Sequence, residues 1–201
     1  MANNEIKIHE HADAARIAAE RGEELSQLSR SSMSEFFDGK KLDEAVESSR
    51  GKVAQALQEG DGQMIFAEVD GELAAMTGYL KRGTWKGRQV YESKNTVTLP
   101  KYRGMSNVTL PLLLAMAKQV EELDKDALIC VYSSDEEHII PLCEKMILAG
   151  RGEEISVDEY HAMMKEAEQM DIPLDEYKGY IEEHPVIKKS RLFMMDLRGK
   201  N

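Results

Sequence analysis

The pattern of apolar and polar residues divides the first third of the chain into strand-like and helix-like segments. Residues 5–9, IKIHE, alternate between apolar and polar, which is typical of a strand, and from His11 the apolar residues recur at helical intervals. A second helical segment covers residues 31–58 and stops at the glycines of EGDG. We therefore expect one strand followed by two helices.

The segments between residues 63 and 100 have the residue pattern of an antiparallel sheet. Residues 63–82 form two apolar runs around Asp70-Gly71, a dipeptide that favours the positive φ of a tight hairpin turn. Residues 88–100 form a third run, which is rich in β-branched residues and ends at Pro100. The pattern predicts three antiparallel strands.

The second half alternates between helices and strands. A helix is expected over residues 107–123, with one apolar face made of Leu110, Leu113, Leu114, Ala117 and Val120. Residues 127–134 are continuously apolar, as in a strand that is buried on both faces. Further helices are expected at residues 136–150, after the capping-box pattern Ser156-x-x-Glu159, and at residues 174–184. A final strand is expected at residues 190–197. We expect an α/β protein with a single domain over residues 1–201.

Composition and charge narrow the function classes. With 201 residues and 42% hydrophobic residues the chain can bury a core. The formal charge of −11 argues against a nucleic-acid surface, which needs clustered Lys and Arg, and would instead steer a cationic amine toward the protein. We expect no nucleic-acid partner.

Compartment and metal content follow from what the sequence lacks. No apolar run reaches the roughly 18 residues of a membrane span, and the start MANNEIKIHEH is too polar for a signal peptide, so we expect a cytoplasmic protein without a membrane partner. Cys130 and Cys143 lie in apolar segments and are expected as buried thiols. The pair His9-x-His11 has no apparent third ligand, so we expect no metal.

One motif connects this order of elements to a known family. The stretch TVTLPKYRGMSNVTLPLLL, residues 96–114, is a strand, a proline, an aromatic residue and an Arg-Gly turn that opens a helix. In motif and order the chain resembles the GCN5-related N-acetyltransferase (GNAT) superfamily over about residues 5–150, as a divergent member. The resemblance implies a mixed central sheet with helices on both faces, antiparallel N-terminal strands and a parallel, splayed pair. Residues 151–201 would then be a helical extension plus the final strand.

The resemblance implies that acetyl-CoA binds at the turn that begins at Arg103. Unpaired N–H groups at a helix N-terminus suit a pyrophosphate. The family pattern Arg/Gln-x-x-Gly-x-Gly/Ala reads here Arg103-Gly104-Met105-Ser106-Asn107-Val108. Ser106 and Val108 depart from it, and Val108 adds a branched side chain where the ligand approaches closely. The alternative is that these residues only cap a core helix.

The strand before the turn would carry the chemistry. The resemblance implies that the main-chain N–H of Thr96 polarises the acetyl carbonyl, that Thr98 meets the pantetheine arm, and that Glu92 is the general base. It also places Leu99 among the cofactor-binding residues. The alternative for Glu92 is a solvated carboxylate at a sheet edge.

The general acid is the second point of departure. Family members often carry Leu-Tyr-Glu-Lys after the buried strand, and this chain has Leu142-Cys143-Glu144-Lys145. Cys143 could donate a proton to the leaving thiolate, or it could be an inert buried residue. Tyr132 and His138 are near enough in sequence to substitute for it.

These resemblances lead to two alternative functions. The first is an acyl-CoA-dependent N-acyltransferase that moves acetyl from acetyl-CoA to a small amine or a protein amino group, by direct attack in a ternary complex. The second is a catalytically inactive GNAT-fold CoA-binding or regulatory protein, which the departures at Ser106, Val108 and Cys143 favour. A homodimer is left open.

Overall fold

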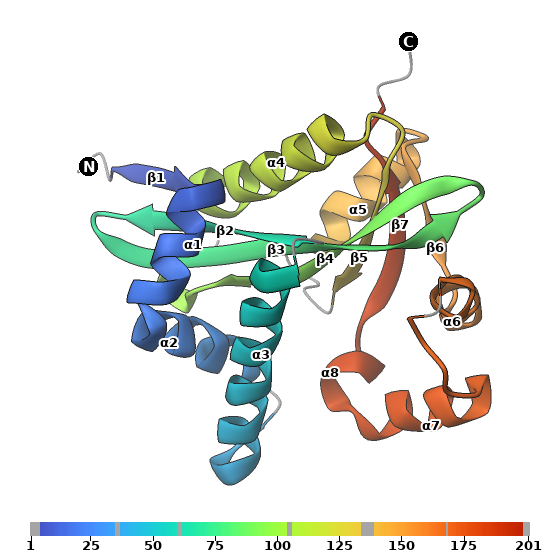
Figure 1. The fold of residues 1–201 in the computed structure, drawn as a ribbon, viewed down its shortest axis with the longest axis horizontal. Coiled ribbons are helices and arrows are strands. Elements are labelled where there is room, and N and C mark those ends of the chain that lie inside the picture. Colours follow the sequence, from blue (N-terminus) through green and yellow to red (C-terminus); the bar gives the residue numbers. More distant parts are fainter. Residues whose placement is uncertain are drawn as a thin grey trace. The chain divides into compact units, whose positions relative to one another are not determined.

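The structure is a computed structural model that describes residues 5–34, 37–59, 62–103, 106–133, 139–167 and 169–198 (Figure 1). Its contacts divide the chain into two compact units. The first unit contains residues 1–80 and 94–118, and the second contains residues 81–93 and 119–201. Strands β3 (Glu72–Trp85) and β4 (Arg88–Thr98) supply residues to both units. The single domain expected from the sequence stays a prediction.

The strands of the first unit follow the order β1-β2-β3-β4. Strand β1 (Ile6–His9) pairs antiparallel with β2 (Gly62–Val69), and β2 pairs antiparallel with β3. Between β2 and β3, Asp70 and Gly71 have φ angles of 50° and 88°, the left-handed conformation of a tight turn. The hairpin predicted at this dipeptide is therefore present.

In the described part of the chain between β1 and β2, three helices take the place of the two expected. They are α1 (His11–Glu20), α2 (Gly22–Met33) and α3 (Gly39–Glu59). The extra boundary lies at Arg21, whose backbone leaves the helical region at φ −115° and ψ 40°. Its guanidinium donates to Glu24, Glu68 and the Gly71 carbonyl oxygen, which ties the bend to the sheet.

Helices cover both faces of the sheet in the first unit. One face packs under α1 and α2 in a cluster that contains Ile17, Leu28, Phe66, Met76 and Val97. Thr77, next to Met76, points to the opposite face, where its hydroxyl donates to the sulfur of Met116 in α4 (Ser106–Leu123) at 3.7 Å.

The buried face of α4 differs from the prediction. Leu110 and Leu114 are 42% and 59% exposed, whereas Val108, Leu112 and Met116 are buried. Apolar residues occupy almost every position at the start of this helix, so periodicity alone did not select the correct face.

The strands of the second unit follow the order β3-β4-β5-β7-β6. Strand β4 runs parallel to β5 (Leu128–Ser133), with the register Val90–Leu128 to Glu92–Cys130. Strand β7 (Arg191–Asp196) pairs antiparallel with β5 and with the short strand β6 (Gly152–Ile155). The parallel pair confirms the predicted mixed sheet. Strand β6 was not anticipated, because GEEI has little apolar pattern.

Among the described residues of the second unit, four helices lie wholly within it. They are α5 (Ile139–Leu148), α6 (Val157–Glu166), α7 (Leu174–Glu183) and α8 (Pro185–Lys188), and the one-turn α8 was not predicted (Figure 1). The capping box at the start of α6 is confirmed. Ser156 Oγ accepts the N–H of Glu159 at 3.2 Å, and Glu159 Oε2 accepts the N–H of Ser156 at 2.7 Å.

Helices also lie on both faces of the sheet in the second unit. One face packs with α6 in a cluster that includes Val90, Cys130 and Leu192. On the other face, Arg191 stacks on the ring of Phe193 and donates to Glu144 of α5. The expected α/β architecture is therefore confirmed. Within the described residues, no helix combines the length and apolar character that crossing a bilayer requires.

Candidate functional site

The turn between β4 and α4 lies in the first unit and is closed by backbone hydrogen bonds. A single 3₁₀ turn (Pro100–Tyr102) follows Leu99, whose carbonyl oxygen accepts the N–H of Tyr102 at 2.9 Å. Arg103 Nε donates to the carbonyl oxygen of Thr98 at 3.2 Å. Gly104 and Met105 lie outside the described residues. The described part of the turn thus directs the chain from the strand end into the start of α4.

The start of α4 is described by its backbone and by the side chain of Val108. Ser106 and Asn107 form the first helical turn by their backbone, and their side chains lie outside the described part. Val108 is 0% exposed, so its side chain points into the core. The branched side chain therefore does not cover the outward face of the turn, where the N–H groups of a helix start would meet a pyrophosphate.

The strand positions before the turn are held by a set of side-chain and backbone contacts. The hydroxyls of Thr96 and Thr77 are hydrogen-bonded at 2.7 Å, and those of Thr98 and Thr109 at 3.0 Å. Leu99 is buried, and its N–H donates to the Ala74 carbonyl oxygen at 2.9 Å. Leu99 thus secures the strand end from within the core rather than presenting a side chain to a ligand.

Glu92 lies in the second unit and is 2% exposed. Arg82 Nε donates to Oε2 of Glu92 at 2.7 Å, and the Tyr160 hydroxyl donates to Oε1 at 3.2 Å. A solvated edge carboxylate, the alternative from the sequence, is excluded. Neither Arg82 nor Tyr160 stands in a motif that marks it as a site residue, and the capping box before Tyr160 is the local signal for the start of its helix.

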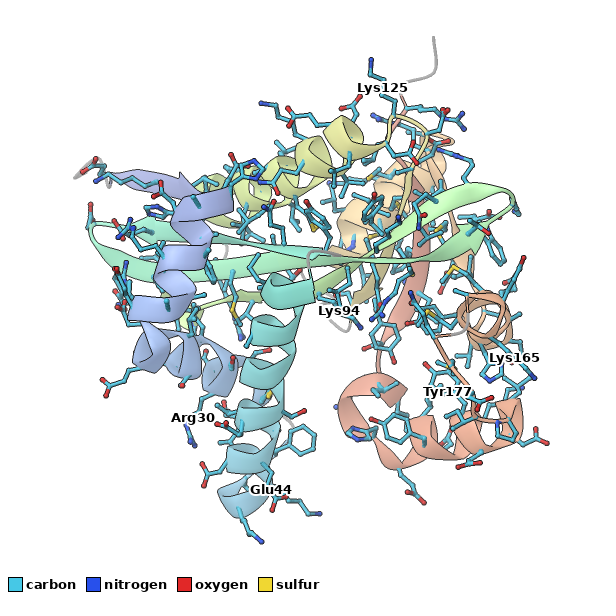
Figure 2. The ribbon with its side chains drawn as sticks, in the orientation of Figure 1. Arg30, Glu44, Lys94, Lys125, Lys165 and Tyr177 are labelled. Carbon is cyan, nitrogen blue, oxygen red and sulfur yellow. The ribbon has the colours of Figure 1, made fainter. Side chains whose placement is uncertain are left out.

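Further groups surround this carboxylate. Arg82 Nη1 donates to Gln169 Oε1 at 3.2 Å, and the ring of Tyr177, which projects from α7, stacks on Tyr160 at 6.5 Å (Figure 2). Burial, and then the charge of Glu92, raise the pKa of Tyr160 far above its ordinary value. The same two causes raise the pKa of Tyr177 to about 12. Both phenols therefore keep their protons at neutral pH.

The two candidate acids lie in different layers of the second unit. Tyr132 packs against the cluster under α6, its hydroxyl donates to the Ile187 carbonyl oxygen at 3.0 Å, and burial raises its pKa. Cys143 is buried in α5, where burial raises the pKa of its thiol to about 11. The structure thus places Tyr132, but not Cys143, on the same sheet face as Glu92. His138 lies outside the described residues.

The thiol of Cys143 is expected to resist alkylation. A pKa raised to about 11 leaves roughly 100-fold less thiolate at pH 8 than an ordinary cysteine, and burial further limits access. Iodoacetamide labelling followed by peptide mass spectrometry should show slow modification of the native protein and rapid modification in guanidinium. Fast labelling of native Cys143 at pH 7 would contradict the buried, protonated thiol.

Solved structures resemble this chain in fold, whereas comparisons of its sequence find no match. No protein-family profile matches the chain, and no curated protein matches it in sequence. A GNAT-family acetyltransferase structure from Staphylococcus aureus Mu50 matches with a TM-score of 0.58 and 13% identity, covering 96% of this chain and 100% of that one. An acetyltransferase from Streptococcus agalactiae 2603 gives 0.53 and 15%, covering 94% and 97%. The PaiA N-acetyltransferase of Thermoplasma acidophilum, in complex with coenzyme A, gives 0.55 and 10%, covering 96% and 99%.

These likenesses assign the GNAT fold to the chain. Within the described residues, no group of three or more His, Cys, Asp or Glu side chains is arranged to hold a metal ion.

Proposed function

We propose that this chain, which has the fold of GNAT acetyltransferases, is an acyl-CoA-dependent N-acyltransferase that transfers acetyl from acetyl-CoA to an amine. The observation that carries the proposal is the path of β4, which pairs parallel with β5 and then leads through the Arg103 turn into α4. The fold likenesses support this class of reaction. The cytoplasm stays the predicted location, and the acceptor is a small amine or a protein amino group.

The binding part of the proposal uses the backbone. The N–H groups from Arg103 to Val108 would hold the pyrophosphate, and Thr98 would meet the pantetheine arm. When bound, acetyl-CoA supplies an activated thioester. The main-chain N–H of Thr96 would donate to the acetyl carbonyl oxygen and so favour attack by the neutral amine.

The chemical part of the proposal assigns proton transfers to side chains. An amine arrives mostly as ammonium at neutral pH and must lose a proton before it can attack. We assign this step to Glu92, directly or through a water molecule. Tyr132 is the proposed donor to the departing thiolate, because it lies on the same sheet face as Glu92 and burial keeps it protonated. Cys143, the other candidate from the sequence, also keeps its proton but lies in the layer on the opposite face.

Isothermal titration calorimetry with acetyl-CoA and with CoA tests the proposal. We expect both to bind, and pantetheine, which lacks the pyrophosphate, to bind at least tenfold more weakly, because charge-assisted hydrogen bonds to the turn would be missing. Absence of heat and of any thermal shift at millimolar acetyl-CoA would exclude the proposed function.

The inactive alternative is favoured by two observations. Glu92 is almost fully buried, and Cys143, at the family's tyrosine position, is a buried residue of α5. A protein that binds CoA but releases no thiol from acetyl-CoA with any of a broad panel of amines would support this alternative. Measurable turnover with one amine would exclude it.

A further inference from the structure

The helix α6 contributes directly to the environment of Glu92, although it lies beyond the segment that resembles the family. Tyr160 is 68 residues from Glu92 in sequence, and its hydroxyl reaches Oε1 of the carboxylate at 3.2 Å. Tyr160 is 6% exposed, so water does not compete freely for this hydrogen bond. The contact therefore joins the carboxylate to the extension after Gly150.

The position of Tyr160 is fixed at both ends of its helix. The capping box of Ser156 and Glu159 defines the start of α6. Toward the other end, α6 packs on the backbone of Gly83 in β3, because a Cβ there would lie 2.4 Å from Cβ of Ala167 and 3.1 Å from the carbonyl oxygen of Met163. Only a glycine allows the helix to approach this closely.

We propose that Tyr160 is a positioning residue for Glu92. The hydroxyl of Tyr160 holds Oε1 of the Glu92 carboxylate and lowers the affinity of this carboxylate for protons. The proposal rests on the proposed function, in which Glu92 receives the proton of the amine. The extension would then tune the base without itself touching the substrate. Releasing the hydroxyl should leave a carboxylate that protonates more readily, since a hydrogen bond to the ionised form favours that form.

Several groups from the surrounding elements face Glu92. Arg82 comes from β3, Cys130 and Tyr132 from β5, Tyr160 from α6 and Tyr177 from α7. Burial keeps Tyr160 protonated over the working range of pH, so its hydroxyl remains a donor. Tyr177 stacks on Tyr160, and no hydrogen bond joins it to the carboxylate among the described contacts. This makes Tyr177→Phe a matched control for Tyr160→Phe.

The titration of Glu92 can be measured without any activity. Carbon-13 NMR of glutamate side-chain carboxyl groups would follow it, with Glu92→Gln used to assign the resonance. We expect Tyr160→Phe to raise the titration midpoint of the Glu92 carboxyl by about one pH unit relative to the native protein. Tyr177→Phe should leave this midpoint within about 0.3 pH unit of the native value. An unchanged midpoint in folded Tyr160→Phe would overturn the proposal.

The kinetic measurement separates this inference from the proposed function. If acetyl transfer occurs, the acidic limb of the kcat profile should move upward with the NMR midpoint in Tyr160→Phe. A midpoint shift in a protein without any transferase activity would support the contact and defeat the proposed function. If Tyr160→Phe turns over substrate while the Glu92 titration midpoint and the acidic limb of the kcat profile both stay unchanged, the proposed function is supported and the positioning role of Tyr160 is refuted.

A second substitution covers the case in which Tyr160→Phe does not fold. A 3-fluorotyrosine placed at position 160 alone keeps the shape of the ring and makes the hydroxyl a stronger donor. We expect it to lower the midpoint of Glu92. An unchanged midpoint in this folded variant would equally refute a role for the hydroxyl.

Discussion

Replacing Glu92 with glutamine is expected to lower kcat for acetyl transfer by roughly 10²–10⁴-fold and to leave CoA affinity nearly unchanged. Glutamine keeps the size of the side chain and can still accept from Arg82, but it cannot take a proton from an ammonium group. The loss should shrink at high pH, where more of the amine is already neutral. Steady-state kinetics across pH 6 to 9 and calorimetry with CoA measure the two quantities separately.

The stability of the Glu92→Gln variant must be measured together with its kinetics, because Glu92 forms an ion pair with Arg82 in the protein interior. Breaking a fully buried ion pair costs about 3–5 kcal/mol, and the cost here should be smaller because Arg82 is 21% exposed. Chemical denaturation therefore has to show that the variant is folded at the assay temperature. Glu153→Gln, at an exposed glutamate of the same unit, is the matched control and should keep kcat within about threefold.

The outcome for Glu92→Gln decides the role of this carboxylate. A kcat within about threefold of the native value across the whole pH range would show that Glu92 is not the base. The proton would then leave through water or through another residue such as His138.

The substitution Gly83→Ala is expected to lower the free energy of unfolding by about 1–3 kcal/mol, the usual cost of overpacking. The added Cβ would meet Cβ of Ala167 at 2.4 Å. It would also lie 3.1 Å from the Met163 carbonyl oxygen. Neither atom belongs to a long side chain that could rotate away, so α6 must move. Denaturation in urea, followed by circular dichroism, measures the change.

A matched glycine provides the control for this experiment. Gly179 lies in α7, and a Cβ there would meet no atom within 4 Å. Gly179→Ala should therefore stabilise the protein by up to about 1 kcal/mol, through helix propensity alone. The double substitution Gly83→Ala with Ala167→Gly should recover most of the lost stability. If Gly83→Ala alone is as stable as the native protein, the close packing of α6 on β3 is wrong.

Local signals in the sequence were sufficient where the structure depends on neighbouring residues. Asp70-Gly71 predicted its hairpin because the turn conformation is a property of those two residues, and the Ser156 capping box predicted the start of α6 for the same reason. The bend at Arg21 was missed because two of the three groups that hold it, Glu68 and Gly71, lie about fifty residues further along the chain.

The same distinction applies to the candidate site. Glu92 was selected through the resemblance to the GNAT superfamily, from its position in the strand before the turn, whereas its burial and its contact with Tyr160 depend on tertiary packing. The predicted face of α4 is correct at Val120, which is buried, and wrong at Leu110 and Leu114, which are exposed. Leucines surround the start of the helix, so only the packed core distinguishes Leu112 from Leu114.

The contacts of Glu92 with Arg82 and Tyr160 also imply an order of assembly during synthesis. Arg82 and Glu92 belong to neighbouring strands joined at Lys86-Gly87, which both have positive φ, so their ion pair can form as soon as this hairpin leaves the ribosome. Tyr160 is made 68 residues later. At about 5–20 residues per second, a nascent chain spends several seconds or more with the ion pair to Arg82 in place and the contact with Tyr160 still missing. During that interval a chaperone could still reach the strand that α6 later covers.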